Sequence, residues 1–204
     1  MTNRFLNILI PGILLPMSLG TVYNYSQYSA NIQQLFEISK FMGDIGFMLI
    51  IFFLGMGAAT FGRMVELNPK RMACVSTVLF SIGMLLMFLA TNFTILPLYY
   101  LACAFMGTGT GIGYTSPIKQ LLSNFEDHKG LASGLAITGF GLGKFVFAPI
   151  IEYLLVNFSL PYMFLILSGI FLVIMSLCSW LYKPNPAYIS TIYTAIPYSR
   201  LIRH

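Results

Sequence analysis

Six long apolar stretches take up most of this chain, and they constrain its fold more than any other feature. Each approaches or exceeds the 20 or so apolar residues that a helix needs to cross a bilayer. Only 8% of the 204 residues are charged, whereas a soluble domain has roughly a quarter. The sequence therefore predicts an all-α, multi-pass membrane protein, with spans at about Phe5–Ser29, Phe41–Phe61, Met72–Ala90, Leu96–Leu122, Leu131–Val156 and Pro161–Leu181.

The distribution of Lys and Arg between these spans predicts their orientation. Of the Lys and Arg residues outside the spans, Lys40 alone is expected on one side of the membrane, and the others are expected on the opposite side. Cytoplasmic segments of membrane proteins are enriched in Lys and Arg. We therefore expect both termini in the cytoplasm, in a plasma or inner membrane, with the N-terminal segment kept as the first span and not removed as a signal peptide. The cations on the cytoplasmic side are Arg4, Arg63, Lys70, Arg71, Lys119, Lys129, Lys183, Arg200 and Arg203.

Two glycine-rich runs, joined by a short polar segment, lie between Gly107 and Pro149. Many of their glycines are four residues apart, a spacing that leaves bare backbone on one helix face and lets another helix approach closely. A nucleotide-binding loop is the alternative, but no G-x-G-x-x-G pattern occurs and no strand precedes the run. We interpret them as helix-packing positions, and the residues assigned to this role are Gly107, Gly109, Gly111, Gly113, Gly139, Gly143 and Pro149.

The chain lacks the residue patterns of common enzymes and metal sites. Cys74, Cys103 and Cys178 lie inside apolar runs without a C-x-x-C spacing, as small buried hydrophobic residues do. No H-E-x-x-H motif and no paired acids at catalytic spacing occur. We therefore expect no enzymatic activity, no metal and no cofactor, and the sparse cations predict no binding to nucleic acid.

Lys144 is the polar residue that most suggests a function. It lies about 13 residues into the fifth span, roughly 20 Å along a helix and past the middle of the bilayer. A cation at that depth is expensive unless it faces water or a partner. Three interpretations remain open. Lys144 can attract an anion in a solute pathway, or it can form a structural pair with Glu152, Asp44 or a group in a partner outside this chain. It can also extend its long side chain outward to the membrane surface.

The first span contains the most polar intramembrane segment, from Tyr23 to Tyr28. It can line an aqueous pathway, or it can belong to the aromatic belt at the membrane surface. Asn24 and Gln27, with Tyr23 and Tyr28, are the better lining candidates, because residues three and four apart share a helix face. The predicted solute-binding set consists of Tyr23, Asn24, Gln27, Lys144 and Tyr114, which lies near the cytoplasmic end of the fourth span.

The glycine-rich segment GTGTGIGYTSPIKQLLSNFEDHKGLASGLAITGFGLGKFVFAP resembles that of the major facilitator superfamily (MFS), in its oxalate/formate antiporter-like or monocarboxylate-transporter-like branch. The segment PMSLGTVYNYSQYSANI is similar to the first span of that branch. The resemblance implies that residues 1–182 are the N-terminal half of a twelve-span carrier, and that 183–204 are a cytoplasmic tail or truncated interdomain linker. Lys144 departs from the family pattern, which has a small or apolar residue there.

The segment GRMVELNPKRM lies where the superfamily has a gating loop between its second and third spans. It matches this pattern in part, with Glu66 where the family has Asp. The residues that carry the match are Gly62, Arg63, Glu66, Lys70 and Arg71.

The resemblance implies transport of a small organic anion, a mono- or dicarboxylate, by alternating access between two six-helix halves. The expected partners are the lipid bilayer, the solute, and a second six-helix half or another copy of this chain. Two alternatives to transport remain open: a truncated or decayed carrier without activity of its own, and a membrane interaction or assembly protein.

Overall fold

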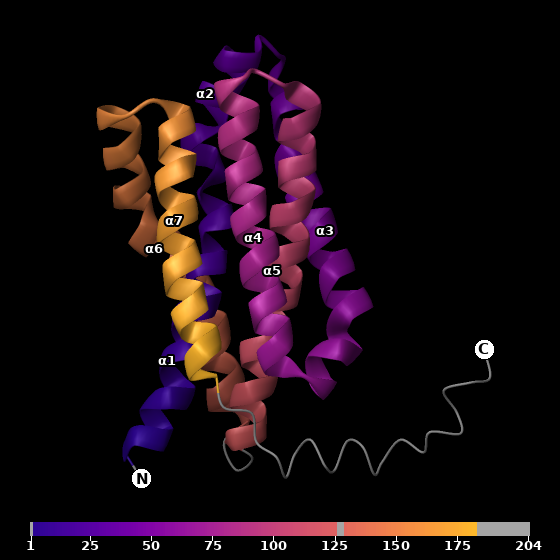
Figure 1. Ribbon diagram of the computed structural model, residues 1–204, viewed down its shortest axis with the longest axis vertical. Coiled ribbons are helices and arrows are strands. Elements are labelled where there is room, and N and C mark those ends of the chain that lie inside the picture. Colours follow the sequence, from indigo (N-terminus) through magenta and orange to yellow (C-terminus); the bar gives the residue numbers. More distant parts are fainter. Residues whose placement is uncertain (1, 126–128, 183–204) are drawn as a thin grey trace, which may run out of the picture.

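The computed structural model describes residues 2–125 and 129–182, and these ranges are built almost entirely of helices (Figure 1). The six predicted spans are all present, and the first is divided into three segments. The tail predicted over residues 183–204 lies outside the described residues. The helices are α1 (Thr2–Leu19), the 3-10 helix η1 (Gly20–Asn24), α2 (Tyr25–Phe36), α3 (Lys40–Leu67), α4 (Pro69–Asn92), α5 (Leu96–Asn124), α6 (Lys129–Asn157) and α7 (Leu160–Leu181).

Five of these spans are long and apolar enough to cross a membrane by length and composition. The α5 helix has sufficient length but is less apolar, because its centre contains four glycines, Gly107, Gly109, Gly111 and Gly113, with Thr108 and Thr110 between them. The helices before and after α5 in the sequence cross the membrane, so α5 also crosses it, in the direction opposite to theirs. The prediction of an all-α, multi-pass membrane protein is confirmed.

Proline residues mark the starts of three helices. Pro69, Pro97 and Pro161 occupy the first or second position of α4, α5 and α7. Proline suits these positions because the first backbone N–H groups of a helix have no partner within it. The connections before these helices are short, and consecutive spans therefore run antiparallel.

The α5 helix lies at the centre of the packing, between α3 and α4, and α4 lies beside α7 (Figure 1). The α6 helix packs mainly against α1 and η1. Large buried side chains fill the interior, among them Phe80, Tyr99, Phe164 and Phe171. The α3 helix has little cover besides α5, and most of its circumference is exposed.

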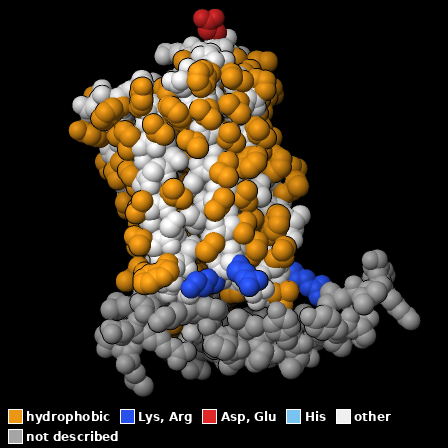
Figure 2. Space-filling view, in the orientation of Figure 1, with side chains coloured by type: hydrophobic (Ala, Val, Ile, Leu, Met, Phe, Trp, Pro, Cys, Tyr) orange, Lys and Arg blue, Asp and Glu red, His pale blue; other side chains and the backbone are white. Residues whose placement is uncertain are grey.

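Most of the charged side chains in the described residues lie near the ends of the bundle, and Lys144, near the middle of α6, is an exception. We call the end where α3 meets α4 the basic end, because Arg63, Lys70, Arg71 and Lys119 lie there. Figure 2 shows Lys and Arg side chains at this end and acidic side chains at the opposite one. The cytoplasmic location of the basic end remains a prediction from the charge distribution.

Candidate functional site

A local change of helix type divides the first span near its middle. Pro11 and Pro16 lie inside α1, and η1 then begins at Gly20. A Cβ atom on Gly20 would overlap the backbone oxygen of Phe140 in α6. Only a glycine at this position allows η1 and α6 to approach so closely.

The contact between η1 and α6 brings three aromatic rings together. Phe140 of α6 packs against Tyr23 of η1, with ring centroids 5.4 Å apart and ring planes at 76°. Phe140 also packs against Tyr114 of α5, at a centroid distance of 4.8 Å. Two phenols that are distant in the sequence therefore lie on either side of one ring, where η1, α5 and α6 meet.

Lys144 follows Phe140 by one helical turn and shares its face of α6. Its side chain is exposed on the bundle. Neither Glu152 nor Asp44 forms an ion pair with it, since among the described residues the ion pair found is that of Lys119 with Glu66. The structure thus does not support the interpretation of Lys144 as a member of a structural pair within this chain.

Gln27 of α2 also contacts α6, farther along that helix. Its side-chain nitrogen donates a hydrogen bond to the backbone oxygen of Ala148, at 3.3 Å, one turn beyond Lys144. Asn24 differs from the expected lining position, because it is fully buried and its side-chain nitrogen lies 3.5 Å from the hydroxyl of Thr21. The side-chain oxygens of Asn24 and Gln27 accept no hydrogen bond within the described part of the chain.

The residues predicted to form a gating loop do not lie in a loop. Asn68 alone separates α3 from α4, because Pro69 already starts the next helix. Gly62, Arg63 and Glu66 therefore lie in the last turns of α3, and Lys70 and Arg71 lie in the first turn of α4.

Two of these helix-end residues contact other helices. Glu66 forms an ion pair with Lys119 of α5, and both side chains are about one-third exposed, at 35%. Lys70 donates a hydrogen bond to the backbone oxygen of Trp180, at 3.3 Å, close to the C-terminus of α7. These contacts tie α3 to α5 and α4 to α7 at the basic end.

The glycines of α5 use two opposite faces, not the single face expected from their spacing. Gly107 and Gly111 face the backbone of α3, whereas Gly109 and Gly113 face α4. A Cβ atom on Gly109 would lie only 2.7 Å from the backbone nitrogen of Phe80. The α5 helix is thus held at close range between two neighbours.

Two glycines of α6 pack against α1. A Cβ atom on Gly139 would lie 2.9 Å from the backbone oxygen of Ile13, and one on Gly143 would overlap that of Met17. Pro149, which the sequence analysis grouped with them, is exposed and lies away from this contact.

Neither the position of Phe140 in the site nor the pairing of Glu66 with Lys119 was predicted from the sequence. Phe140 lies four residues before Lys144, and this spacing was the one signal available for it. The ion pair joins residues 53 positions apart, and nothing in the local pattern indicates that separation.

The site offers a cation, two phenols and an amide beside apolar surface. Such groups suit a small anion with an apolar part, because charge-assisted and neutral hydrogen bonds then hold its charged end. No group of three or more metal-binding side chains occurs in residues 2–125 and 129–182. The arrangement fits solute binding better than catalysis.

Comparison with known proteins finds matches among membrane transporters. Residues 4–197 match the family model of the Major Facilitator Superfamily. Monocarboxylate transporter 13 of Rattus norvegicus is 32% identical over 120 residues, which are 58% of this chain and 27% of that protein. Monocarboxylate transporter 12 of Xenopus laevis is 35% identical over 107 residues, which are 52% of this chain and 23% of that protein.

A bacterial relative matches more of the sequence. The uncharacterized MFS-type transporter YhjX of Escherichia coli is 27% identical over 179 residues, which are 87% of this chain and 44% of that protein. The chain spans less than half the length of these curated relatives. The resemblance predicted from the glycine-rich segment is confirmed, and the chain belongs to the major facilitator superfamily.

Proposed function

We propose that this chain forms six helices of a membrane carrier that transports a small organic anion, a mono- or dicarboxylate. Lys144 attracts the carboxylate, and the hydroxyls of Tyr23 and Tyr114 with the amide of Gln27 orient it. The apolar part of the solute packs against Phe140.

One observation supports this proposal above all: residues from η1, α5 and α6 converge on a face that α4 and α7 do not cover. The aromatic contacts of Phe140 join Tyr23 to Tyr114. Lys144 is one turn away on the same helix. With Gln27 of α2, four elements thus supply the polar groups, as a binding site between helices requires.

A second six-helix unit completes the proposed pathway. MFS carriers hold their solute near the membrane midplane between two related halves, and the relatives found are more than twice as long as the segment matched. In this chain α3 and α6 both have large exposed apolar side chains, among them Phe52, Met56, Phe145 and Val146. The second unit is a separate six-helix half or another copy of this chain, and the basic end faces the cytoplasm.

Uptake of labelled acetate and oxalate by cells that express the chain tests the proposal, alone and with a second MFS half. We expect Lys144→Gln to reduce carboxylate uptake roughly ten- to a hundredfold, the range for losing a hydrogen bond to a charged group. Lys40→Gln is the matched control, because it removes the same charge at the opposite end of the bundle from the basic end. We expect this control to retain uptake.

Two outcomes would contradict the proposal. Equal uptake by the Lys144→Gln and Lys40→Gln variants would remove Lys144 from the solute site. No carboxylate uptake in either assembly, from chains that reach the membrane, would exclude transport and favour an assembly protein or an inactive remnant.

A further inference from the structure

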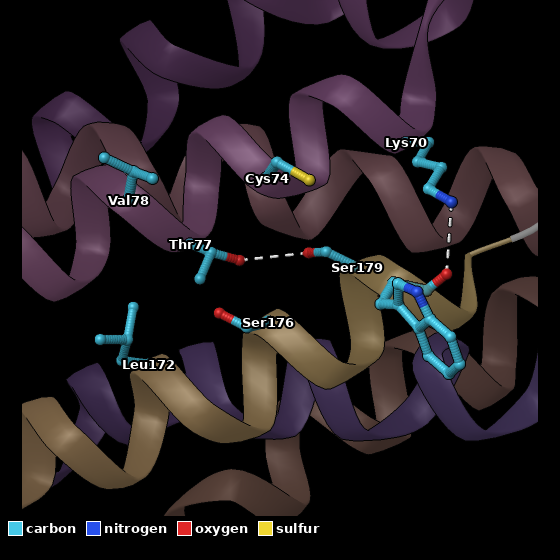
Figure 3. Close-up of a pocket in the computed structure, with 8 residues that line it drawn as sticks. Lys70, Cys74, Thr77, Val78, Leu172, Ser176 and Ser179 are labelled. Carbon is cyan, nitrogen blue, oxygen red and sulfur yellow. Dashed lines mark hydrogen bonds between the residues drawn. The ribbon is translucent and has the colours of Figure 1, made fainter.

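A groove outside the solute-binding face lies between α4 and α7, near the basic end. Its volume is about 270 Å³. Figure 3 shows its walls, and the described residues that line it belong to these two helices. The residues used below are Lys70, Cys74 and Thr77 of α4, and Ser176, Ser179 and Trp180 of α7.

Small side chains explain why a groove exists here. Cys74 and Ser176 leave space between the two helices at mid-depth, where larger side chains would fill it (Figure 3). The hydroxyls of Thr77 and Ser179 lie 3.2 Å apart and join the helices beneath that space. Thr77 and Ser179 are buried, whereas Cys74 and Ser176 are exposed, and the groove therefore opens outward.

The end of the groove nearest the basic end is positively charged. Lys70 donates one hydrogen bond there, to the backbone oxygen of Trp180. An ammonium group has three donors, so two remain for another acceptor. Arg71 follows on the same first turn of α4, whose N-terminus adds partial positive charge. Among the described residues, no Asp or Glu lines the groove.

The other end of the groove is apolar. Val78 and Leu172 lie there, each eight residues from Lys70 or Trp180 along its helix, which is roughly 12 Å. The exposed side chains of Val75 and Leu177 extend this apolar surface beside the groove. The groove therefore has a cation at the bundle end, where a phospholipid of that leaflet has its phosphate, and an apolar surface deeper in the membrane, where the lipid has its acyl chains.

We propose that this groove binds an anionic phospholipid of the leaflet at the basic end. Its phosphate lies on Lys70, its glycerol region lies between Cys74 and Ser176, and one acyl chain follows Val78 and Leu172. Pockets that enclose a whole ligand measure about 300–1,000 Å³, and a smaller open groove suits a molecule that lies mostly in the bilayer. Basic pockets between membrane helices on the cytoplasmic side commonly bind such head groups. The site is independent of the transport activity proposed above.

Trp180 allows a direct test, because it is the only tryptophan of the chain and is 75% exposed beside the groove. The full-length chain is placed in phosphatidylcholine vesicles that contain an equal fraction of brominated phosphatidylglycerol or brominated phosphatidylcholine. Bromine quenches tryptophan fluorescence on contact. We expect the anionic lipid to be favoured about fivefold at Trp180, the preference that one cation near a membrane surface provides.

Three variants separate the groove from its surroundings. Lys70→Gln should reduce the preference for the anionic lipid to about one. Ser176→Leu should also reduce it, because it fills the groove without changing any charge. The matched control Arg63→Gln removes a cation at the same bundle end, on α3 and outside the groove, and should retain the preference.

Several results would overturn the proposal. One is equal quenching by the two lipids in the unmodified protein, which would mean ordinary contact with the bilayer. Another is an unchanged preference in both Lys70→Gln and Ser176→Leu. A third is an equal loss in Arg63→Gln, which would assign the effect to the overall charge of the basic end.

Discussion

Exchange of Gly143 for alanine should separate α6 from α1, and it provides the sharpest test of the packing described here. A Cβ atom at this position would overlap the backbone oxygen of Met17 and lie 2.9 Å from the Cα atom of Gly20. Both neighbours are backbone atoms, so no side chain can rotate away. Gly141 is the matched control, because it lies on the same helix and nothing lies within 4 Å of a Cβ atom there.

The size of the effect follows from these distances. Carbon atoms in ordinary contact are roughly 3.5–4.0 Å apart, so α1 and α6 must separate by about 1 Å. Forcing an extra methyl group into a well-packed contact costs about 1–3 kcal/mol. Replacement of glycine by alanine also favours the helix by about 1 kcal/mol, but this gain is common to both variants. Gly143→Ala should therefore be less stable than Gly141→Ala by about 1–3 kcal/mol.

The free energy of unfolding in mixed micelles, titrated with SDS and followed by circular dichroism, measures this difference. The fluorescence of Trp180 gives a second signal from α7, which detects whether unfolding is cooperative. Two variants of equal stability would refute the reasoning, because the contact between Gly143 and Gly20 would then not exist in the folded protein.

Two further predictions concern contacts that involve α3. Glu66→Lys should lower the free energy of unfolding by up to about 1 kcal/mol, and adding Lys119→Glu should restore most of the loss, because the two side chains pair. A double variant no more stable than Glu66→Lys alone would disprove that pairing in a double-mutant cycle. Gly46→Ala should destabilise the protein by about 1–3 kcal/mol relative to Gly55→Ala, because its Cβ atom would crowd the ring of Tyr99, whereas that of Gly55 meets nothing within 4 Å. Matching melting temperatures for these two variants would contradict the contact.

The sequence predicted the number of spans and their order, and it placed most of their ends within a few residues. The α3 helix was expected to end at Phe61 but continues to Leu67. The charges of Arg63 and Glu66 lower the hydropathy there without breaking the helix, and Asn68 is the first residue outside it. Hydropathy therefore located the membrane-spanning part of α3, whereas the start of α4 at Pro69 determined where the helix ends.

The candidate site was less predictable, because its geometry depends on which helices are neighbours. The spacing suggested that Gln27 shares a face with Tyr23 and with Asn24, but Tyr23 and Asn24 are adjacent and point about 100–120° apart in either helix type. Asn24 faces the interior, whereas Tyr23 stays partly exposed, at 38%. The contact of Tyr114 with Phe140 joins α5 to α6 and could not be inferred from either helix alone.

Close backbone contacts at glycines hold each of two groups of helices together, and the candidate site joins one group to the other. The glycines of α5 hold it against α3 and α4, whereas Gly20, Gly139 and Gly143 hold α6 against the first span. Tyr23 and Phe140 belong to the second group, and Tyr114 belongs to the first. A movement of one group against the other would therefore change the 4.8 Å separation between Tyr114 and Phe140. It would leave the ring pair of Tyr23 and Phe140 nearly unchanged, because backbone contact beside Gly20 fixes that pair. A solute held by both tyrosines would consequently bind best at one relative position of the two groups, which is how binding energy can select a conformation.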